Sequence, residues 1–500
     1  MKSCSLCLNL VITLLVPSGL FGDDGESNRS RPNIVLILAD DLGYGDLACY
    51  GHPRMKTPRL DKFAANGLKL NSCYAAAANC SPSRAGLMTG RTPFRVGIFN
   101  WIPMLSPMHV KRSETTIATL LRNAGYDTCH VGKWHLNGTF NMPAQPQPGD
   151  HGFQHWFSTQ NNALPNHKNP HNFVRNGTPV GPLKGYSAEL VADESILWLE
   201  TKRDEAKPFF LFVCFHEPHE PIATAKKYTD LYPSDDPSLS AHHGNVSQLD
   251  TQFGRIVDKL DSLGLRKDTI VWFTSDNGPA ITRIHPHGSS GGLRDKKGAM
   301  YEGGIRVPGI IQWPGVVKEK SVSDVPTSGI DVLPTFCELA NVELPKGVTL
   351  DGTSVAAILK GKTVARKKPL YWQFNRASSD MKVAIRLDRW KLLAKLDTPP
   401  LKPSGGITAK EMAELKKANL IGFELYDLQV DPKETTVVND RHPETFQQLK
   451  DAMQKMYREV RDEAPTWPEW EFARYESKRI EWPDYWTNRR RNQEAKKLKK

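Results

Sequence analysis

Three apolar runs of the chain end abruptly in polar residues, and helical patterns lie between them. The runs cover Ile34–Leu38, Phe209–Phe215 and Thr269–Thr274. Their continuous apolar character predicts strands of a buried sheet. Amphipathic patterns such as Thr116–Ala124 and Leu249–Leu263 predict helices that cover both faces of this sheet. The alternation predicts an α/β fold, in which ligands bind at the edge where the strands end.

From about Lys368 the pattern changes to short segments separated by turns. Four segments have the length and spacing of small antiparallel strands, and Thr445–Glu463 predicts a closing amphipathic helix. We therefore expect one large domain over residues 32–367 and a smaller C-terminal subdomain over residues 368–488. The four predicted strands of the subdomain are Leu370–Phe374, Lys382–Arg386, Trp390–Ala394 and Glu424–Leu428.

The first 22 residues have the pattern of a secretory signal peptide. Lys2 precedes a short apolar run over Leu6–Val16, and small residues follow before Asp23. The run is shorter than the roughly 20 residues that a spanning helix needs. We expect the signal peptide to be cleaved, residues 23–31 to be a linker, and the protein to be secreted or periplasmic without stable membrane insertion.

Composition and charge narrow the class of partner. The chain is 39% hydrophobic and 24% charged, which is typical of a globular protein. Its formal net charge of +11 suggests an acidic partner, but residues 489–500 alone hold seven basic side chains and one acid. We expect this basic tail to be disordered. Because no recognition motif or aromatic-interleaved basic segment accompanies it, we expect no binding of nucleic acid.

The most informative segment is the string CSPSR at Cys80–Arg84. A cysteine near a helix N-terminus is most often a small buried hydrophobe, but this string is rare by chance. It resembles the activation signature of the type I sulfatases in the alkaline phosphatase superfamily. The resemblance extends from Pro32 to Glu424–Leu428 and implies a large mixed, mostly parallel sheet sandwiched by helices as the catalytic domain.

The resemblance also implies that Cys80 is oxidised to formylglycine (3-oxoalanine) by a formylglycine-generating maturation enzyme. The hydrated aldehyde has two hydroxyls on one carbon. One would attack sulfur to give a covalent sulfo-enzyme intermediate, and deprotonation of the other would expel sulfate, so hydrolysis is divided into two easier steps. Arg84, one helical turn after Cys80, would steady the hydrated group and the metal site.

Four residues with oxygen ligands follow two of the predicted strands: Asp40, Asp41, Asp276 and Asn277. An all-oxygen set suits Ca²⁺ or Mg²⁺ rather than zinc or copper. Taken alone, Asp-Asp after a strand is most often a turn or a helix cap. The resemblance places Cys80 beside these residues as a further member of the metal site, and it favours Ca²⁺ over Mg²⁺.

Lys133 and His135 lie in a Gly-Lys-Trp-His segment that is similar to a sulfate-binding element of the family. The resemblance implies that Lys133 contacts a sulfate oxygen and the nucleophile. His135 would take the proton from the second hydroxyl during sulfate release. A lone lysine or histidine would by default be a surface residue or a satisfied core residue, so the interpretation depends on the ordered pair.

Two further elements leave a choice between neighbours. The segment Pro-His-Glu-Pro implies that His219 binds sulfate and faces the leaving oxygen, although His216 competes for this role. The Lys-Gly…Glu-Gly-Gly block implies that Lys297, next to the glycine, contacts the leaving group. Lys296 would then be its exposed neighbour.

Three polar loops are candidates for reading the substrate: Asn100–Pro107, Gln160–Asn176 and Ile281–Gly288. Their polarity suits a hydroxyl-rich ligand and predicts a sulfated carbohydrate as substrate, unless the loops are merely solvated. Within them we select His167, His171 and Arg283 as substrate contacts, beside Lys133, His219 and Lys297 of the sulfate site. The loops also hold Asn161, Asn162, His285 and His287.

Three other functions stay open. The chain could be an arylsulfatase of broad specificity, or a phosphodiester or phosphonate ester hydrolase of the same superfamily. It could also be a non-catalytic binder of sulfated polysaccharide that uses lysines and arginines as an anion cradle. Because each position of the active-site pattern is filled, the non-catalytic binder is the least favoured. The oligomeric state does not follow from the sequence.

Overall fold

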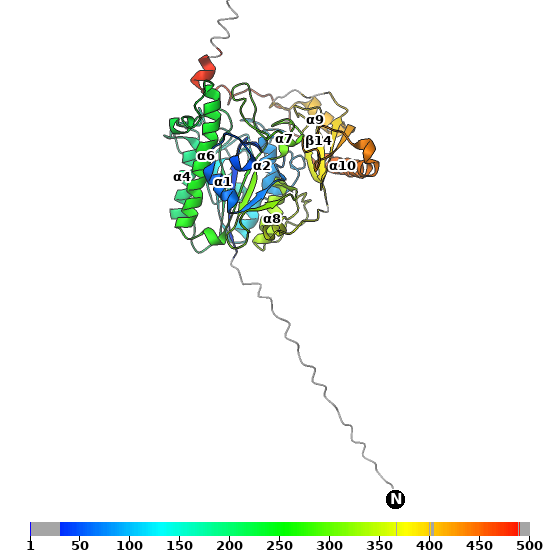
Figure 1. Ribbon diagram of the computed structural model, residues 1–500, viewed down its shortest axis with the longest axis horizontal. Helices are drawn as coiled ribbons and strands as arrows, with labels where there is room; N and C mark the ends of the chain where they lie inside the picture. Colours follow the sequence, from blue (N-terminus) through cyan, green and yellow to red (C-terminus); the bar gives the residue numbers. More distant parts are fainter. Residues whose placement is uncertain (2–30, 367, 400, 402–404, 489, 491–500) are drawn as a thin grey trace, which may run out of the picture.

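The computed structural model describes residues 1, 31–366, 368–399, 401, 405–488 and 490 (Figure 1). Apart from Met1 and Arg490, the predicted signal peptide and basic tail lie outside the described residues, as does the predicted linker up to residue 30. None of the helices in the described part of the chain combines the length and apolarity needed to cross a bilayer.

A mixed sheet of ten strands forms the centre of the described structure, in the order β11-β2-β10-β9-β1-β8-β4-β5-β6-β7. Its five central strands, β9 to β5, are parallel, whereas β10 is antiparallel to β9. The predicted mixed, mostly parallel sheet is therefore present. The strands are β1 (Asn33–Ala39), β2 (Leu68–Leu70), β4 (Asp127–Lys133), β5 (His155–Thr159), β6 (Val174–Arg175), β7 (Thr178–Pro179), β8 (Phe209–Cys214), β9 (Thr269–Ser275), β10 (Gly309–Gln312) and β11 (Ser321–Ser323).

The side chains of β1 alternate between two apolar cores, one on each face of the sheet. Ile34 and Leu36 enter the core covered by α2, α3 and α8, whereas Val35 and Ile37 enter the core covered by α1, α4 and α6. Helices thus cover both faces (Figure 1). Their bounds are α1 (Pro58–Ala65), α2 (Cys80–Thr89), α3 (Ile117–Asn123), α4 (Ser187–Thr201), α6 (Pro237–Ser262) and α8 (Val332–Leu339).

Both predicted helices are present, with shifted bounds. The predicted Thr116–Ala124 becomes α3, because Thr116 is its N-cap and accepts a hydrogen bond through its side chain. The helix predicted over Leu249–Leu263 is the last part of α6, which begins at Pro237. The earlier turns of α6 bury polar residues such as His242, so they lack the apolar spacing on which the prediction relied.

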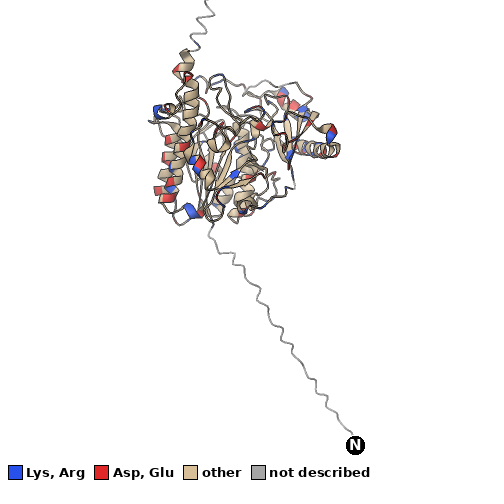
Figure 2. Cartoon of the chain, viewed as in Figure 1, with Lys and Arg blue, Asp and Glu red and all other residues tan. Residues whose placement is uncertain are grey.

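Charges of both signs are mixed along the outer helices α4 and α6 (Figure 2). Two ion pairs join these helices, Arg255 with Asp193 and Lys259 with Glu200. The mixture agrees with the near-neutral charge of the chain outside its basic tail.

The C-terminal part holds an antiparallel sheet in the order β13-β14-β15-β16, as the sequence predicts. Its last strand begins four residues earlier than predicted, and helix α9 was not predicted. The elements are β13 (Leu370–Gln373), β14 (Val383–Leu387), β15 (Trp390–Leu396), α9 (Ala409–Lys417), β16 (Leu420–Asp427) and α10 (Pro443–Glu463). Short elements elsewhere are β3 (Cys73–Tyr74), α5 (Lys226–Thr229), α7 (Glu302–Ile305) and β12 (Thr327–Ser328).

After α10 the chain returns to the large sheet as residues 465–488, which we call the C-terminal strap; this segment is irregular up to residue 483 and ends in a short helical stretch over residues 484–488. Trp467 donates its indole N–H to the carbonyl of Gly97 at 2.7 Å. The ring of Phe472 packs edge-on against Trp101, and the amide of Glu481 donates to the carbonyl of Pro165 at 2.9 Å. The strap therefore crosses two of the loops that the sequence nominates for substrate recognition.

A buried ion network joins the two parts of the molecule. Lys391 of β15 contacts Glu302 at the start of α7 at 3.0 Å and Glu434 at 2.8 Å, and all three side chains are fully buried. The hydroxyl of Tyr74 also donates to Glu302 at 2.6 Å. Because buried carboxylates need a compensating charge, Lys391 is the residue on which this junction depends.

We expect Lys391→Met to lower the free energy of unfolding by about 3–5 kcal/mol, because it leaves buried Glu434 without its cation and Glu302 with only the longer contact to Arg306, at 3.4 Å. The matched control is Lys395→Met on the same strand, where an exposed pair with Asp380 is expected to contribute about 0–1 kcal/mol. Urea unfolding followed by fluorescence measures both. Equal losses for the two variants would contradict the role given to the buried network.

Candidate active site

The predicted oxygen ligands meet at the carboxyl ends of two neighbouring strands. β1 and β9 are parallel, with Ala39 opposite Ser275, so the residues that follow each strand lie side by side. Asp41 accepts a hydrogen bond from the Asn277 amide at 2.7 Å, and its own backbone N–H donates to Asp276 at 3.2 Å. The side chains are at most 2% exposed, and Asp41 has a left-handed backbone with φ of 66°.

Cys80 is the first residue of helix α2 and lies buried beside this acidic group. One turn later Arg84 donates to Asp276 through Nε at 2.9 Å and to the carbonyl of Lys133 at 2.8 Å. Arg84 therefore ties α2 to the ends of β9 and β4. The contact explains why the cysteine and the aspartates, far apart in sequence, share one site.

Two lysines flank the same group. The Nζ atom of Lys133, at the end of β4, is 2.6 Å from Asp40 Oδ2. The Nζ atom of Lys297 is 2.6 Å from Asp41 Oδ1 and 3.4 Å from the sulfur of Cys80. Lys296 points elsewhere and donates to the carbonyl of Ile281. Of the two adjacent lysines, the structure thus brings Lys297 to the cysteine.

The histidines take different positions around the cluster. The Nε2 atom of His219 lies 3.6 Å from Asp41 Oδ2. His216 instead contacts the end of β5, with its Nε2 atom 2.8 Å from the hydroxyl of Thr159. His135 is buried, with Nε2 at 3.1 Å from the carbonyl of Ile102, and its Nδ1 has no hydrogen-bond partner among the described residues.

The three predicted substrate contacts in the loops do not behave alike. His167 is fully buried with its ring 5.4 Å from that of His216, and neither ring nitrogen has a hydrogen-bond partner in the described part of the chain. His171 and Arg283 have exposed side chains. Across the described residues, no hydrogen bond or ion pair ties the side chain of either one to the buried cluster.

Burial and charge set the protonation of the cluster. Burial acts to raise the pKa of Asp40, but the charges of Lys133, His219 and Arg84 outweigh it and hold this pKa well below its usual value. Burial raises the pKa of the Cys80 thiol to about 11, although the nearby lysines act in the opposite direction. The carboxylate is therefore ionised and the unmodified thiol is protonated, which makes the thiol a weak nucleophile at neutral pH.

The residues fit a hard cation. Asp40 Oδ1 and Asn277 Oδ1 are buried oxygens without a hydrogen-bond partner among the described residues, and such acceptors are costly unless something binds them. Ligand atoms of Asp40, Asp41, Cys80 and His219 all lie within 4.8 Å of one another. Each of the three aspartates among the predicted ligands also pairs with a cation: Asp40 with Lys133, Asp41 with Lys297, and Asp276 with Arg84.

The C-terminal strap adds site residues that the sequence did not reveal. Glu476, 6% exposed, accepts hydrogen bonds from the side-chain amide of Asn161 at 2.8 and 2.9 Å and from the backbone of Asn162 at 3.2 Å. The hydroxyl of Tyr485 hydrogen-bonds to His285. The one signal in the sequence is the density of aromatic residues in the strap, namely Trp467, Trp470, Phe472, Tyr475, Trp482, Tyr485 and Trp486.

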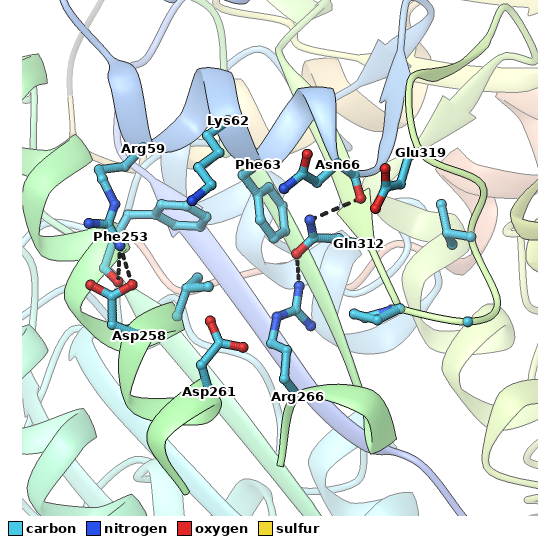
Figure 3. Close-up of a pocket in the computed structure, with 15 residues that line it drawn as sticks. Arg59, Lys62, Phe63, Asn66, Phe253, Asp258, Asp261, Arg266, Gln312 and Glu319 are labelled. Carbon is cyan, nitrogen blue, oxygen red and sulfur yellow. Dashed lines mark hydrogen bonds and ion pairs between the residues drawn. The ribbon is translucent and has the colours of Figure 1, made fainter. Parts of the chain in front are cut away.

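A separate cavity of about 310 Å³ lies at the opposite end of the sheet, where β9 begins (Figure 3). Its polar groups bind one another. Arg59 pairs with Asp258, Arg266 donates to Gln312, and Gln312 donates to the carbonyl of Asn66. The cavity lacks the unpartnered buried oxygens found at the ends of β1 and β9, so we place the active site at those strand ends.

Two family models match the chain. The sulfatase model matches residues 32–342, and the model described as N-sulphoglucosamine sulphohydrolase, C-terminal, matches residues 290–399. The second match crosses the domain boundary predicted near residue 367, and that boundary stays a prediction.

Known proteins resemble the chain over most of its length. It is 33% identical to human arylsulfatase A, over 84% of this chain and 86% of that protein. It is 29% identical to an N-acetylgalactosamine-6-O-sulfatase of Bacteroides thetaiotaomicron, over 87% and 94%. The crystal structure of Ps i-CgsB in complex with k-i-k-neocarrahexaose superimposes with a TM-score of 0.76 at 25% identity, covering 88% of this chain and 95% of that one.

These matches confirm the resemblance drawn from the CSPSR string, and they confirm the alkaline phosphatase-like fold. The family uses a metal ion and a formylglycine, and the cluster around Cys80 holds the acidic residues for a metal site. The chain belongs to the sulfatase family and is a sulfuric ester hydrolase.

Proposed function

We propose that this sulfatase releases inorganic sulfate from a sulfated carbohydrate, with Cys80 converted to formylglycine and Ca²⁺ held at the ends of β1 and β9. The observation that carries the proposal is the position of Cys80. It is buried at the start of α2, 3.4 Å from the Lys297 ammonium group and beside the acidic cluster. A sulfate group bound at Cys80 would lie between the ammonium groups of Lys133 and Lys297.

Two groups complete the site. When formed by a maturation enzyme, formylglycine supplies a hydrated aldehyde with one hydroxyl for nucleophilic attack and a second for release of sulfate. Asp40, Asp41 and Asn277 would hold the cation, which supplies Lewis acidity to the sulfate oxygens when bound. Ca²⁺ is favoured because it accepts an irregular set of oxygen ligands, whereas Mg²⁺ demands near-octahedral geometry.

The side chains of the chain itself bind and orient the ester. Lys133 and Lys297 place positive charge where negative charge develops on the sulfate oxygens, and each ammonium is held in position by an aspartate. His135 keeps a free Nδ1, through which it can accept a proton. His219 lies on the Asp41 side, where it would bind sulfate and face the leaving oxygen.

A carbohydrate substrate is supported by three observations. Relatives are named as N-acetylgalactosamine-6-sulfatases, and a structural neighbour at 25% identity holds k-i-k-neocarrahexaose. The loop that Glu476 holds offers two buried amide oxygens, on Asn161 and Asn162, without hydrogen-bond partners among the described residues. Such oxygens can accept hydrogen bonds from sugar hydroxyls. The name arylsulfatase A among the relatives favours, as a second candidate, an arylsulfatase of broad specificity.

The test of the substrate is a sulfate-release assay across a panel of regiochemically defined sulfated mono- and disaccharides, with an aryl sulfate for comparison. We expect kcat/KM for one sugar sulfate to exceed that for the aryl sulfate by at least about tenfold, since a fitted pocket adds binding in the transition state. Cys80→Ala is expected to abolish release, and peptide mass spectrometry verifies that the wild-type segment carries the aldehyde.

Two results would contradict this proposal. Indifference to the sugar combined with high aryl sulfate turnover favours the broad arylsulfatase. Sulfate release that survives Cys80→Ala places the chemistry at another residue.

The test of the ion is thermal unfolding of metal-stripped protein. At a Ca²⁺ concentration of 100 times Kd, we expect about 2.7 kcal/mol of added stability, because the folded state alone binds the ion. Mg²⁺ at equal concentration is expected to add less. Asp41→Asn should reduce the response, whereas the exposed Asp230→Asn should keep it. A larger response to Mg²⁺, or an unchanged response in Asp41→Asn, would refute the calcium site.

A further inference from the structure

A groove of about 920 Å³ lies between the C-terminal strap and the first turns of α6. One wall is Trp482, Pro483 and Tyr485 of the strap, and the other includes Ile222 and Ser240. In Figure 1 the last, red segment of the strap lies at one end of α6. No part of the sulfate site described above lines this groove.

We propose that this groove is a binding subsite for an uncharged sugar residue that is linked to the sulfated sugar. The inference rests on the proposed function, because it assumes a carbohydrate substrate. In this arrangement the sulfated sugar lies at the sulfate site, and the sugar linked to it lies in the groove.

A chain of contacts connects the groove to the sulfate site. Tyr485, at the end of the groove, hydrogen-bonds through its hydroxyl to His285, and His285 Nδ1 lies 2.8 Å from the carboxylate of Glu220. Glu220 directly follows His219, the residue that faces the leaving oxygen. Ile222, two residues further on, already lines the groove. The groove therefore adjoins the His219 side of the sulfate site, the side assigned to the leaving group.

The strap wall of the groove is held in place. Glu476 is buried and binds Asn161 and Asn162, and the Glu481 amide donates to the carbonyl of Pro165 at 2.9 Å. These contacts anchor the strap before Trp482, and the hydrogen bond of Tyr485 to His285 anchors it after Pro483, so the wall exists before substrate binds. A preformed wall lowers the entropic cost of binding.

The lining indicates the chemistry of the ligand. The rings of Trp482 and Tyr485 are half-buried, and an aromatic face covers the C–H face of a sugar ring well. The ionisable groups of the lining are Lys168 against three acids, Asp230, Glu481 and Asp484. Lys226 pairs with Asp230 at 2.7 Å, which leaves Glu481 and Asp484 against Lys168. This remaining negative charge disfavours a uronic acid or a second sulfate here, so the fitting residue is a neutral hexose or N-acetylhexosamine.

The experiment compares two substrates with one sulfated residue in common, the sulfated monosaccharide and a disaccharide that links the same residue to a neutral sugar. We expect Trp482→Ala to lower kcat/KM for the disaccharide about tenfold, because the variant removes the aromatic wall. Turnover of the monosaccharide is expected to stay within about twofold. Trp482→Phe should recover most of the loss, which separates a lost ring contact from misfolding.

The control is Trp313→Ala. This tryptophan is also partly exposed, but it directly follows β10, and its indole donates to the carbonyl of Lys267, just before β9, at 3.0 Å. We expect Trp313→Ala to leave kcat/KM for both substrates unchanged. We also expect the wild-type enzyme to prefer the disaccharide with the neutral sugar over the same disaccharide with a uronic acid.

Three outcomes would overturn the subsite: equal turnover of the disaccharide by Trp482→Ala and wild type, equal losses on both substrates, or a preference for the uronic acid. Each leaves hydrolysis of the sulfated monosaccharide by the wild type intact. If the wild type instead hydrolyses aryl sulfate but no sulfated sugar, the proposed function fails as well, and the two failures are thus distinguishable.

Discussion

Charge balance between three buried carboxylates and three cations, of which Arg84 and Lys133 are buried and Lys297 is partly exposed, holds this active site together. Burying an ionised group is costly unless an opposite charge compensates it in good geometry. Here the compensation joins elements that are distant in sequence, because each pair links the end of one strand to a different helix, strand or loop. The pairs are Asp276 with Arg84, Asp40 with Lys133, and Asp41 with Lys297.

The same balance explains how the site can serve chemistry. Lys133 and Lys297 are fixed by their aspartates, so their positive charge is available to an oxyanion without reorganisation at the moment of reaction. A cation bound between Asp40 and Asp41 would compensate the same aspartates and leave more of the lysines' positive charge to act on the sulfate. The buried thiol, whose pKa burial raises to about 11, is poorly suited to attack by itself, which agrees with a modified Cys80.

Much of this centre could be predicted from the sequence, because its residues follow apolar strands or lie in short motifs. The Asp40–Asp41 pair and the Asp276–Asn277 pair are brought together by parallel neighbouring strands, which is a general property of α/β sheets. The motif favours Lys297 over Lys296 only through its place next to the glycine, because the direction of each side chain depends on how one loop turns. In the structure Lys297 lies 3.4 Å from the sulfur of Cys80, whereas Lys296 contacts the carbonyl of Ile281.

The surroundings of the centre could not be predicted in the same way. Glu476 lies more than 300 residues from its partner Asn161 in the sequence. Hydrophobic periodicity and short motifs describe only neighbouring residues, so they could not predict this contact. The first turns of α6 bury histidines and amides instead of apolar side chains, so their periodicity is hidden. Arg283 has an exposed side chain, and its role as a substrate contact stays a prediction.

The central claim is that Lys297 supplies positive charge at the reacting sulfate. It is tested by kcat/KM for sulfate release by Lys297→Ala and by its neighbour Lys296→Ala, each with formylglycine content verified. The account predicts a loss of about 100-fold or more for Lys297→Ala, as for other groups that stabilise developing charge, and a change within about twofold for Lys296→Ala. Near-wild-type activity of Lys297→Ala, or an equal loss in both variants, would contradict it.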